Sequence, residues 1–475
     1  MSEIAPPTAT TTRTSQRPSS GYARYVFWVM FLISFLNYLD RNILTGAANV
    51  VAKELNFQLD GIGYIASAFL IIYTLGALPL GIWADRAKRK NVVASCVAAW
   101  SVATAATALA TNFITLFFAR MFLGIGEAGY FPAGTALMSD YFSREKRSRI
   151  MSWWSVAQLV GILAGFALGG AIAGLYPGSW RLLFIFTGIP GLLLALLAWK
   201  VREPRRNQAD EEAIDLDSHS LGNVPEVEEP PHTLGVPSNT MTQLKSLLRI
   251  KTLVVLILMQ IFAFFVLGVN VTFLPTYLQQ GDIFHFTSAQ AGLFSGIVIV
   301  LAGMAGTVIG GYVSDMLNRH HQGARVLVCG IGFLLGAPSF MLAITIHNVP
   351  IFTIFFVLTT LLLTVYTGPS TAATQDVVPS ALRASAVAIS LLIAHLLGDA
   401  FAPTLVGVLA TNFDPTHGLH FKNGLAGQDL SIALLVTCTP ALVIAGLIGI
   451  FGARWMKDDI AAAEQIDRQA RKAAV

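Results

Sequence analysis

Apolar runs of about 20 residues, separated by short polar stretches, follow one another along most of the 475-residue chain. Each run is long enough to cross the ~30 Å hydrocarbon core of a bilayer as an α-helix. Only 12% of the residues are charged, whereas soluble domains contain roughly 25%. The runs also lack the apolar–polar alternation of membrane β-barrel strands. The sequence therefore predicts an all-α membrane protein with many spans.

About twelve spans can be placed from the hydropathy pattern. We expect them at residues 24–48, 61–84, 91–110, 113–138, 150–174, 181–200, 251–279, 289–313, 325–346, 349–374, 385–410 and 429–453. A hydrophilic, Pro-containing segment at 201–250 is predicted to be a solvated linker. The Thr-, Ser- and Pro-rich segment 1–21 is predicted to be a disordered tail, and 456–475 a second tail. The linker would separate two six-helix bundles, 22–200 and 251–455.

The positive charges of the chain are distributed unevenly between the two sides of the membrane. With the N-terminus in the cytoplasm, most of the 31 Lys and Arg residues lie in the tails, the linker or cytoplasmic loops. Only Lys53, Arg181 and Lys422 fall outside, and Arg41 and Arg120 fall within spans. Because short loops rich in Lys and Arg stay cytoplasmic, we expect both termini in the cytoplasm. We further expect the cell membrane, plasma or inner, as the location.

The two halves of the chain share a motif. GIWADRAKRK, after the second span, matches GYVSDMLNRH, after the eighth, and such repeats are typical of transporters built from two related halves. Glycine lets a neighbouring helix approach closely, and the charges can hold the halves together when the cytoplasmic side is closed. We therefore predict a gate that comprises Gly81, Asp85, Arg86, Arg89 and Lys90 in the first half and Gly311, Asp315 and Arg319 in the second. The second copy is degenerate, with Met316 in place of Arg86.

Four charged residues interrupt the first and fourth spans: Asp40, Arg41, Arg120 and Glu127. A charge at the bilayer centre costs about 2.5–3.5 kcal/mol even on the most permissive scale, so such residues usually serve a function. A rise of ~1.5 Å per residue allows Arg120 to lie level with Asp40 and Arg41 if the two spans pack together, with Glu127 beneath them.

We expect Arg41 and Arg120 to bind an anionic group through charge-assisted hydrogen bonds. Asp40 and Glu127 would exchange protons, because burial disfavours an ionised carboxylate while a nearby guanidinium favours it. The alternative is a neutral ion-pair cluster that only locks the helices together.

Other polar residues within spans are candidate substrate contacts. Asn37 and Tyr38 adjoin the Asp–Arg pair, and Asn270 lies in the middle of the seventh span. His395 and Asp399 are separated by one helical turn and so share a face. They form either a hydrogen bond that packs helices or a polar spot on the cavity wall, with an additional proton site as a further possibility.

The gate motif resembles that of the major facilitator superfamily, which carries it between spans two and three, and the resemblance covers roughly residues 22–455. Four stretches are similar to the Spinster family: NYLDR at 37–41, ARMFLGIGEAGYFPA at 119–133, REPRR at 202–206 and HLLGDAFAP at 395–403. The resemblance implies a major facilitator fold and alternating access. It also implies proton-linked transport of lysolipids, with Asp40, Arg41, Arg120 and Glu127 in the polar cavity. The Asp–Arg pair also resembles the anion–cation symporter branch, which imports sugar acids.

The preferred hypothesis is a proton-coupled secondary active transporter of an amphiphilic anion such as a lysolipid. The alternative is a proton symporter of small organic anions such as sugar acids. The chain contains no phosphate-binding loop, metal-ligand cluster or nucleophile motif, so we expect no enzyme, no cofactor, no metal and no nucleic-acid partner. Its expected partners are the substrate, protons and membrane lipid. We see no sign of obligate oligomerisation and expect a monomer.

Overall fold

The structure, a computed structural model, describes residues 20–204, 209, 240–280, 284–413 and 425–473. Within this part of the chain, 12 helical segments are long and apolar enough to cross a membrane, and there is no β-strand. The predicted all-α fold with twelve spans is confirmed. Most of the predicted tail at 1–21 and most of the linker at 201–250 lie outside the described residues.

The first six spans form one bundle. They comprise α1 (Ser20–Glu54), α2 (Leu59–Arg86), α3 (Arg89–Ala108), α4 (Phe113–Ala128) with α5 (Tyr130–Tyr141), α6 (Arg144–Ala173) and α7 (Trp180–Lys200). The helix of the fourth span is interrupted at Gly129. An added Cβ there would lie 2.8 Å from Cys96 Sγ and 2.9 Å from the Cβ of Leu80, so glycine allows this break to pack against α2 and α3.

The last six spans form the second bundle. After the short helix α9 (Thr240–Leu247), they comprise α10 (Lys251–Leu278), α11 (Ser288–Ile297) with the π-helical turn η1 (Val298–Ala302) and α12 (Gly303–Asn318), α13 (Ala324–Thr345), α14 (Val349–Thr364) with α15 (Thr367–Val377), η2 (Ser380–Leu382) with α16 (Arg383–Ala394), the π-helical turn η3 (His395–Asp399) and α17 (Ala402–Phe413), and α18 (Leu425–Gly452).

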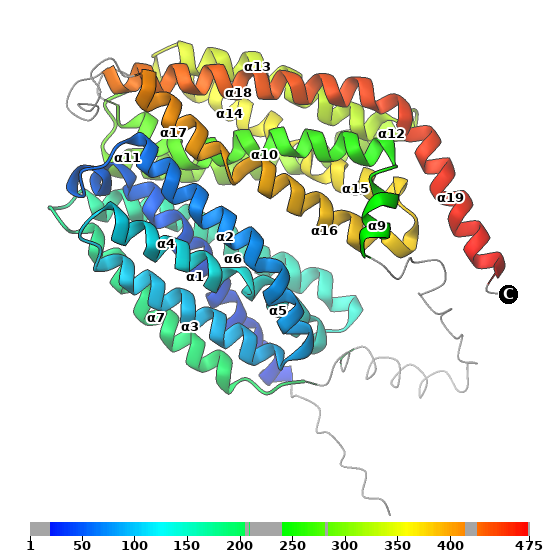
Figure 1. Cartoon of the computed structure of the whole chain (residues 1–475), viewed down its shortest axis with the longest axis horizontal. Coiled ribbons are helices and arrows are strands. Elements are labelled where there is room, and N and C mark those ends of the chain that lie inside the picture. Colours follow the sequence, from blue (N-terminus) through cyan, green and yellow to red (C-terminus); the bar gives the residue numbers. More distant parts are fainter. Residues whose placement is uncertain (1–19, 205–208, 210–239, 281–283, 414–424, 474–475) are drawn as a thin grey trace, which may run out of the picture.

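The predicted C-terminal tail begins as a helix. After the 3₁₀ turn η4 (Ala453–Trp455), residues Met456–Ala473 form α19, which extends beyond the bundle (Figure 1). The carboxylate of Asp459 in α19 accepts a hydrogen bond of 2.7 Å from the backbone N–H of Thr252. This N–H belongs to the first turn of α10, where backbone donors lack a partner within the helix. α19 is therefore attached to the seventh span.

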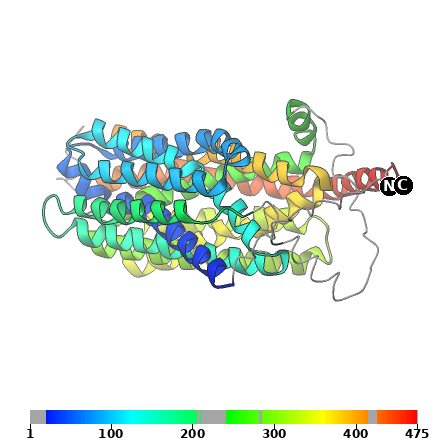
Figure 2. The same cartoon turned by 90° about the horizontal axis from the view of Figure 1, so that it is seen from below.

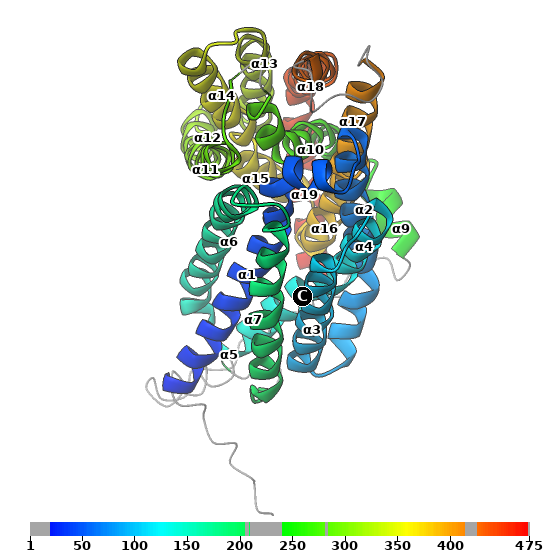
Figure 3. The ribbon, with the colours of Figure 1, turned by 90° about the vertical axis from the view of Figure 1, so that its left-hand side faces the viewer.

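The two bundles converge at one end of the molecule and diverge toward the other (Figure 1). We call the end at which α1 begins and α19 lies the termini side, and the opposite end the far side; Figure 2 shows the long axis from below. Seen from the far side in Figure 3, α6 lies beside α11 and α2 beside α17. These two pairs form most of the contact between the halves, and α1 adds contacts with α10 and α11.

Close packing at the far side depends on glycines of α6. An added Cβ at Gly169 would lie 2.4 Å from the carbonyl oxygen of Ile43 in α1. One at Gly170 would lie 2.1 Å from the carbonyl oxygen of Ser288 in α11. Real Cβ atoms do not approach so closely, so any side chain here would push the helices apart. The neighbouring pair α2 and α17 is joined by a 3.1 Å hydrogen bond from Thr404 N–H to the hydroxyl of Ser67.

On the termini side the halves do not touch at the predicted gate glycines. An added Cβ at Gly81 or Gly311 would have open space around it, with no atom within 4 Å. Gly311 does lie near α15 of its own half, since an added Cβ at Gly368 would be 3.7 Å from the Gly311 Cα. Among the described residues no helix of the other half approaches either glycine, and this conformation is closed on the far side and open on the termini side.

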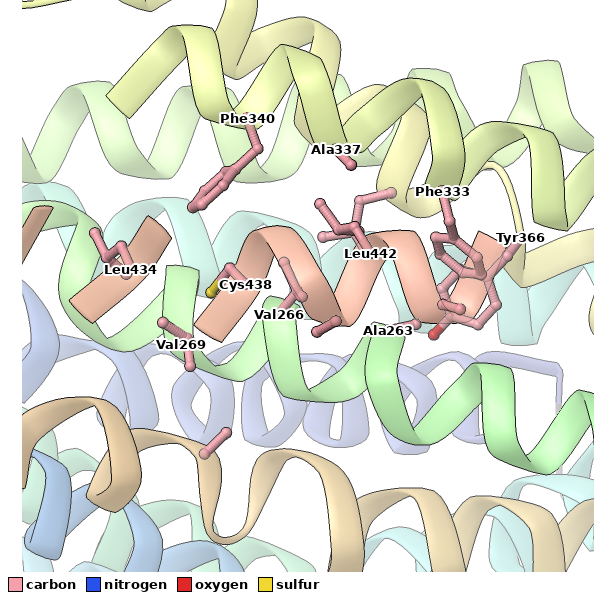
Figure 4. Packing of buried hydrophobic residues seen from close by; sticks show 14 of the residues in the cluster. Ala263, Val266, Val269, Phe333, Ala337, Phe340, Tyr366, Leu434, Cys438 and Leu442 are labelled. Atoms are coloured by element: carbon pink, nitrogen blue, oxygen red, sulfur yellow. The ribbon is translucent and has the colours of Figure 1, made fainter. Parts of the chain in front are cut away.

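A dense apolar core fixes α10 within the second bundle. Val266 and Val269 of α10 pack toward Phe333 and Phe340 of α13 and Leu442 of α18, all of them fully buried (Figure 4). Its other sides contact η3, α16 and α17 of the same half and α1 of the first half. The core thus determines which α10 side chains reach the space between the two halves.

Candidate functional site

The charged residues of the first and fourth spans meet inside the first bundle. Arg41 Nη2 lies 2.7 Å from Glu127 Oε2, and Arg41 Nε donates to the same oxygen at 3.1 Å. The Glu127 side chain is completely buried, whereas 22% of the Arg41 side chain is exposed. The glutamate therefore holds the arginine from behind while the other edge of the guanidinium stays accessible.

Arg41 is also surrounded by aromatic rings. Its guanidinium carbon lies 4.6 Å from the ring centre of Tyr73, 5.0 Å from that of Phe69 and 5.2 Å from that of Tyr38. A cation at such distances is attracted to the electron-rich faces of the rings. These contacts fix the position of Arg41, and they identify Tyr73 and Phe69, which the sequence motifs did not single out, as part of the site.

Arg120 lies level with Asp40, as its helical position predicted. Its Nη1 donates a 3.1 Å hydrogen bond to the backbone carbonyl of Asp40, and its guanidinium packs over the ring of Phe184 at 4.6 Å. The other two nitrogens, Nε and Nη2, are buried without a hydrogen-bond partner among the described residues. Buried polar groups of this kind are rare in folded proteins. These two donors therefore lack an acceptor in this conformation, and protein atoms enclose them.

Asp40 is fully buried behind this layer. Thr104 Oγ1 donates a 3.2 Å hydrogen bond to Asp40 Oδ2, and the hydroxyl of Thr187 also lies beside the carboxyl group. The side chain of Asn37 lies beside the Glu127 carboxyl group in the same way. Each carboxyl group is therefore buried next to neutral polar side chains.

A cavity of about 380 Å³ lies between the two halves. Arg41 and Arg120 line it, whereas Asp40 and Glu127 lie behind them and do not. Most of the remaining lining is apolar and includes Leu44, Ile62, Ile65, Phe69, Leu123 and Leu267. Ile62 and Ile65 belong to the first two turns of α2, so the apolar part extends from the arginines toward the far side.

His395 and Asp399 line the same cavity from the second half. His395 Nδ1 lies 2.9 Å and 3.2 Å from the two carboxylate oxygens of Asp399. The imidazole also contacts the ring of Phe264 edge-on, with ring centres 4.4 Å apart. The pair thus forms a hydrogen bond within its own turn and also lines the cavity.

Asn37 and Asn270 lie away from the cavity, although both were predicted to contact substrate. Asn37 is 3% exposed and lies beside Glu127, and Asn270 is 7% exposed. Neither is among the residues that line the cavity, so this conformation gives them no direct route to a ligand. Tyr38, predicted with them, does line it.

The first gate motif is bound to two residues that the sequence motifs did not reveal. Arg89 forms an ion pair with Asp140 of α5, and also donates to the carbonyl of Ala136 at 3.3 Å. The carboxylate of Glu203 accepts from the backbone N–H groups of Arg89 at 2.7 Å and Lys90 at 3.0 Å, the first residues of α3. The predicted gate residues Asp85 and Arg86 are exposed.

In the second gate motif, the structure assigns the ion pair to a different arginine from the one predicted. Arg325 Nη2 lies 3.0 Å from Asp315 Oδ1, and Arg325 also pairs with Asp376 of α15. Arg319, which the motif aligned with Arg89, is exposed. The loop after Asp315 is longer than the loop after Asp85, so counting residues from the aspartate leads to the wrong arginine.

Comparisons with known proteins agree with this architecture. The sequence model of the Major Facilitator Superfamily matches residues 30–403. A crystal structure of a bacterial homolog to the human lysosomal transporter Spinster, inward-facing and unoccupied, superimposes with a TM-score of 0.75 at 23% identity, covering 94% of this chain and 98% of that one. The D-xylose–proton symporter gives 0.63 at 17% identity, covering 92% and 97%. At these identities the structural likeness establishes the fold.

Curated relatives point to the same group. Protein spinster homolog 1 of Mus musculus is 26% identical over 457 residues, which are 93% of this chain and 82% of that protein. Protein spinster homolog 3 of Danio rerio is 26% identical over 475 residues, which are 97% of this chain and 90% of that protein. The chain therefore belongs to the Major Facilitator Superfamily, and it is a membrane transporter that resembles the Spinster proteins.

Proposed function

We propose that this transporter carries an amphiphile with an anionic group, such as a lysolipid, by alternating access coupled to protons. The observation that carries the proposal is the composition of the cavity. Arginines form its polar end, and an apolar surface forms most of the rest. Such a surface suits an acyl chain, and the arginines suit a phosphate or carboxylate.

Arg120 supports the assignment of the anionic group. A buried guanidinium is expected to satisfy its donors, yet two of its nitrogens lack a partner in the described part of the chain. Arg41 approaches the same cavity with 22% of its side chain exposed. A phosphate oxygen between them would gain two charge-assisted hydrogen bonds, each about twice as strong as a neutral one.

The carboxyl groups behind the arginines supply a route for proton coupling. The ionised form of Glu127 is stable only while the charge of Arg41 compensates it, because an uncompensated buried charge is strongly destabilising. A substrate anion that binds Arg41 would remove this compensation, and protonation of Glu127 would then neutralise the buried carboxylate. Arg120 lies near Asp40 but donates to its backbone carbonyl, so its charge acts on the Asp40 carboxyl group without a direct ion pair. Binding of substrate and binding of protons would thereby favour each other.

We also propose that both termini are cytoplasmic, in the cell membrane, because most Lys and Arg residues then lie in the cytoplasm. In that orientation, the structure is open toward the cytoplasm. The gate residues, now including Arg325, would come together across the halves when this side closes. The transported species would enter or leave as the contact of α6 with α11 and α2 with α17 opens.

Reconstitution in liposomes tests the proposal. We expect uptake of a fluorescent lysolipid that changes with an imposed pH gradient, and no uptake of a sugar acid such as gluconate. The double variant Asp40→Asn and Glu127→Gln is expected to lose the response to the gradient. Asp458→Asn, the same change at an exposed position of α19, should keep it. Transport of gluconate without lysolipid would instead establish the small-anion alternative, and an unaltered pH response in the double variant would exclude these two carboxyl groups.

A further inference from the structure

We propose that Tyr73 and Phe69 of α2 are positioning residues, which hold Arg41 toward the cavity when Glu127 is neutral. The empty site then stays ready to bind an anion after a proton has entered. The inference rests on the proposed function, in which binding of substrate accompanies protonation of Glu127. It assigns a part in this coupling to two aromatic side chains that carry no charge.

Arg41 depends on a single hydrogen-bond acceptor in the described part of the chain. Its Nε and Nη2 both donate to the same oxygen of Glu127, Oε2, at 3.1 Å and 2.7 Å. The other charged residues of the cluster, Asp40 and Arg120, bind each other's helices and not Arg41. The bonds to Glu127 weaken when its carboxyl group takes up a proton, because the attraction between opposite charges is lost. An arginine side chain has many rotamers, so Arg41 then needs a second restraint to keep the orientation that a ligand requires.

The rings of α2 supply a restraint that does not depend on the charge of Glu127. The guanidinium carbon of Arg41 lies 4.6 Å from the ring centre of Tyr73 and 5.0 Å from that of Phe69. These two rings are one helical turn apart, with centres separated by 6.0 Å and planes inclined by 23°. A cation is attracted to ring faces, most strongly where water is excluded. Tyr38 also lies near the guanidinium but belongs to the same helix as Arg41, whereas the α2 rings restrain the arginine from a separate helix.

Close packing of α2 against α4 places the rings beside Glu127. An added Cβ at Gly124 of α4 would lie 2.7 Å from the carbonyl oxygen of Phe69 and 3.2 Å from the backbone nitrogen of Tyr73. Glycine at this position therefore lets the two backbones meet at the residues that carry the rings. Glu127 follows Gly124 by three residues and so lies on the same face of α4. Arg41 is thereby held from α4 by the carboxylate and from α2 by the rings.

Tyr73 can act on a ligand only through Arg41. Arg41 and Phe69 line the cavity, whereas Tyr73 is half-buried and is not among the lining residues. A change at Tyr73 therefore alters how Arg41 is held and leaves the lining of the cavity intact. Because apparent affinity falls with the fraction of protein in the binding-competent arrangement, loss of this ring should weaken binding most when Arg41 has no ionised partner.

A double-mutant cycle tests the inference. Purified protein in nanodiscs is titrated with a fluorescent lysolipid, and Glu127→Gln stands for the protonated glutamate. We expect Tyr73→Leu to weaken binding about threefold when Glu127 is present and at least about tenfold in the Glu127→Gln background. Tyr73→Phe, which retains a ring, should bind within about twofold of its parent protein in both backgrounds. The matched control is Tyr64→Leu, the same change at an exposed position of α2, which should also stay within about twofold in both.

Equal losses from Tyr73→Leu in the two backgrounds would overturn the inference and leave the proposed function intact. So would a Tyr73→Phe variant that binds as weakly as Tyr73→Leu, because the ring would then not be the part that matters. If thermal unfolding shows that Tyr73→Leu does not fold, Phe69→Leu and Phe69→Tyr make the same comparison at the second ring. If neither the wild-type protein nor Glu127→Gln binds the lysolipid, the proposed function fails and this inference fails with it.

Discussion

Arg89 in the first half and Arg325 in the second occupy equivalent positions. Arg89 binds Asp140 and Arg325 binds Asp376, and in both pairs the aspartate follows the arginine by 51 residues. Both arginines are at the start of the third span of their half, in α3 and α13. Both aspartates are near the end of the fourth span, in α5 and α15. The internal repeat is thus preserved as a contact, even where the loop that carries the motif has changed length.

The two equivalent ion pairs should differ in their contribution to stability. The Asp140 side chain is 3% exposed, whereas that of Asp376 is 32% exposed. Breaking a buried pair leaves an unpaired charge and costs about 3–5 kcal/mol, while an exposed pair contributes about 0–1 kcal/mol. We therefore expect Asp140→Asn to lower the thermal unfolding temperature much more than Asp376→Asn, measured in detergent by intrinsic fluorescence. Equal losses would mean that burial does not determine the strength of these pairs.

Arg325, which pairs with Asp315 of the second gate motif, should be required for transport, whereas Arg319 of the motif itself should not. Arg325 joins the end of α12 to the end of α15 through Asp315 and Asp376, whereas Arg319 is exposed. Arg325→Gln is expected to reduce lysolipid uptake at least about tenfold, since it removes an arrangement of two charged contacts. Arg319→Gln should stay within about twofold of the wild-type protein, as expected of an exposed charge. A loss of the same size at Arg319 would show that its motif position matters more than its contacts.

Glu203 should stabilise the start of α3. Its carboxylate accepts from the backbone N–H groups of Arg89 and Lys90, at the positive end of the helix dipole. Glu203→Ala is expected to cost about 1–2 kcal/mol, as for loss of a helix cap with a favourable charge. Glu203→Gln, which keeps an acceptor oxygen, should cost less. The matched control is Glu464→Gln in α19, whose exposed pair with Arg468 is expected to contribute under about 0.5 kcal/mol. Thermal unfolding of the three variants would rank them.

The sequence predicts the spans and the charged cluster because both follow from local geometry. Runs of apolar residues give the spans, and the helical rise is enough to place Arg120 level with Asp40. Partners that depend on packing between distant segments, such as Asp140 and Asp376, could not be identified in this way.

The position of Asn270 relative to the cavity also could not be predicted from the sequence. α10 is apolar around its whole circumference, so its pattern does not reveal which side faces the cavity. Phe264 lines the cavity, and the sequence did not identify it for the same reason. A phenylalanine in a span is equally compatible with facing lipid, the protein core or a cavity.

Arg120 should be irreplaceable by lysine if it binds the anionic group of the substrate. Its guanidinium packs over Phe184 and donates to the Asp40 carbonyl, and its two other nitrogens are buried without an acceptor among the described residues. A lysine keeps the charge but provides neither the planar stack nor several donors at fixed angles. We expect Arg120→Lys to weaken lysolipid binding at least about tenfold, measured as competition with a fluorescent lysolipid for the purified protein in nanodiscs.

The matched control for this prediction is Arg181→Lys. Arg181 also stacks on an aromatic ring, Trp180, at 4.2 Å, but it pairs with Glu54 at the far side and does not line the cavity. Its replacement should leave lysolipid affinity within about twofold, as expected for a partly exposed ion pair. If Arg120→Lys binds as tightly as the wild-type protein, the positive charge alone is sufficient, and the unpaired nitrogens of Arg120 do not determine recognition. If both variants lose affinity equally, the effect reflects general destabilisation of the first bundle, and thermal unfolding of the two proteins would show it.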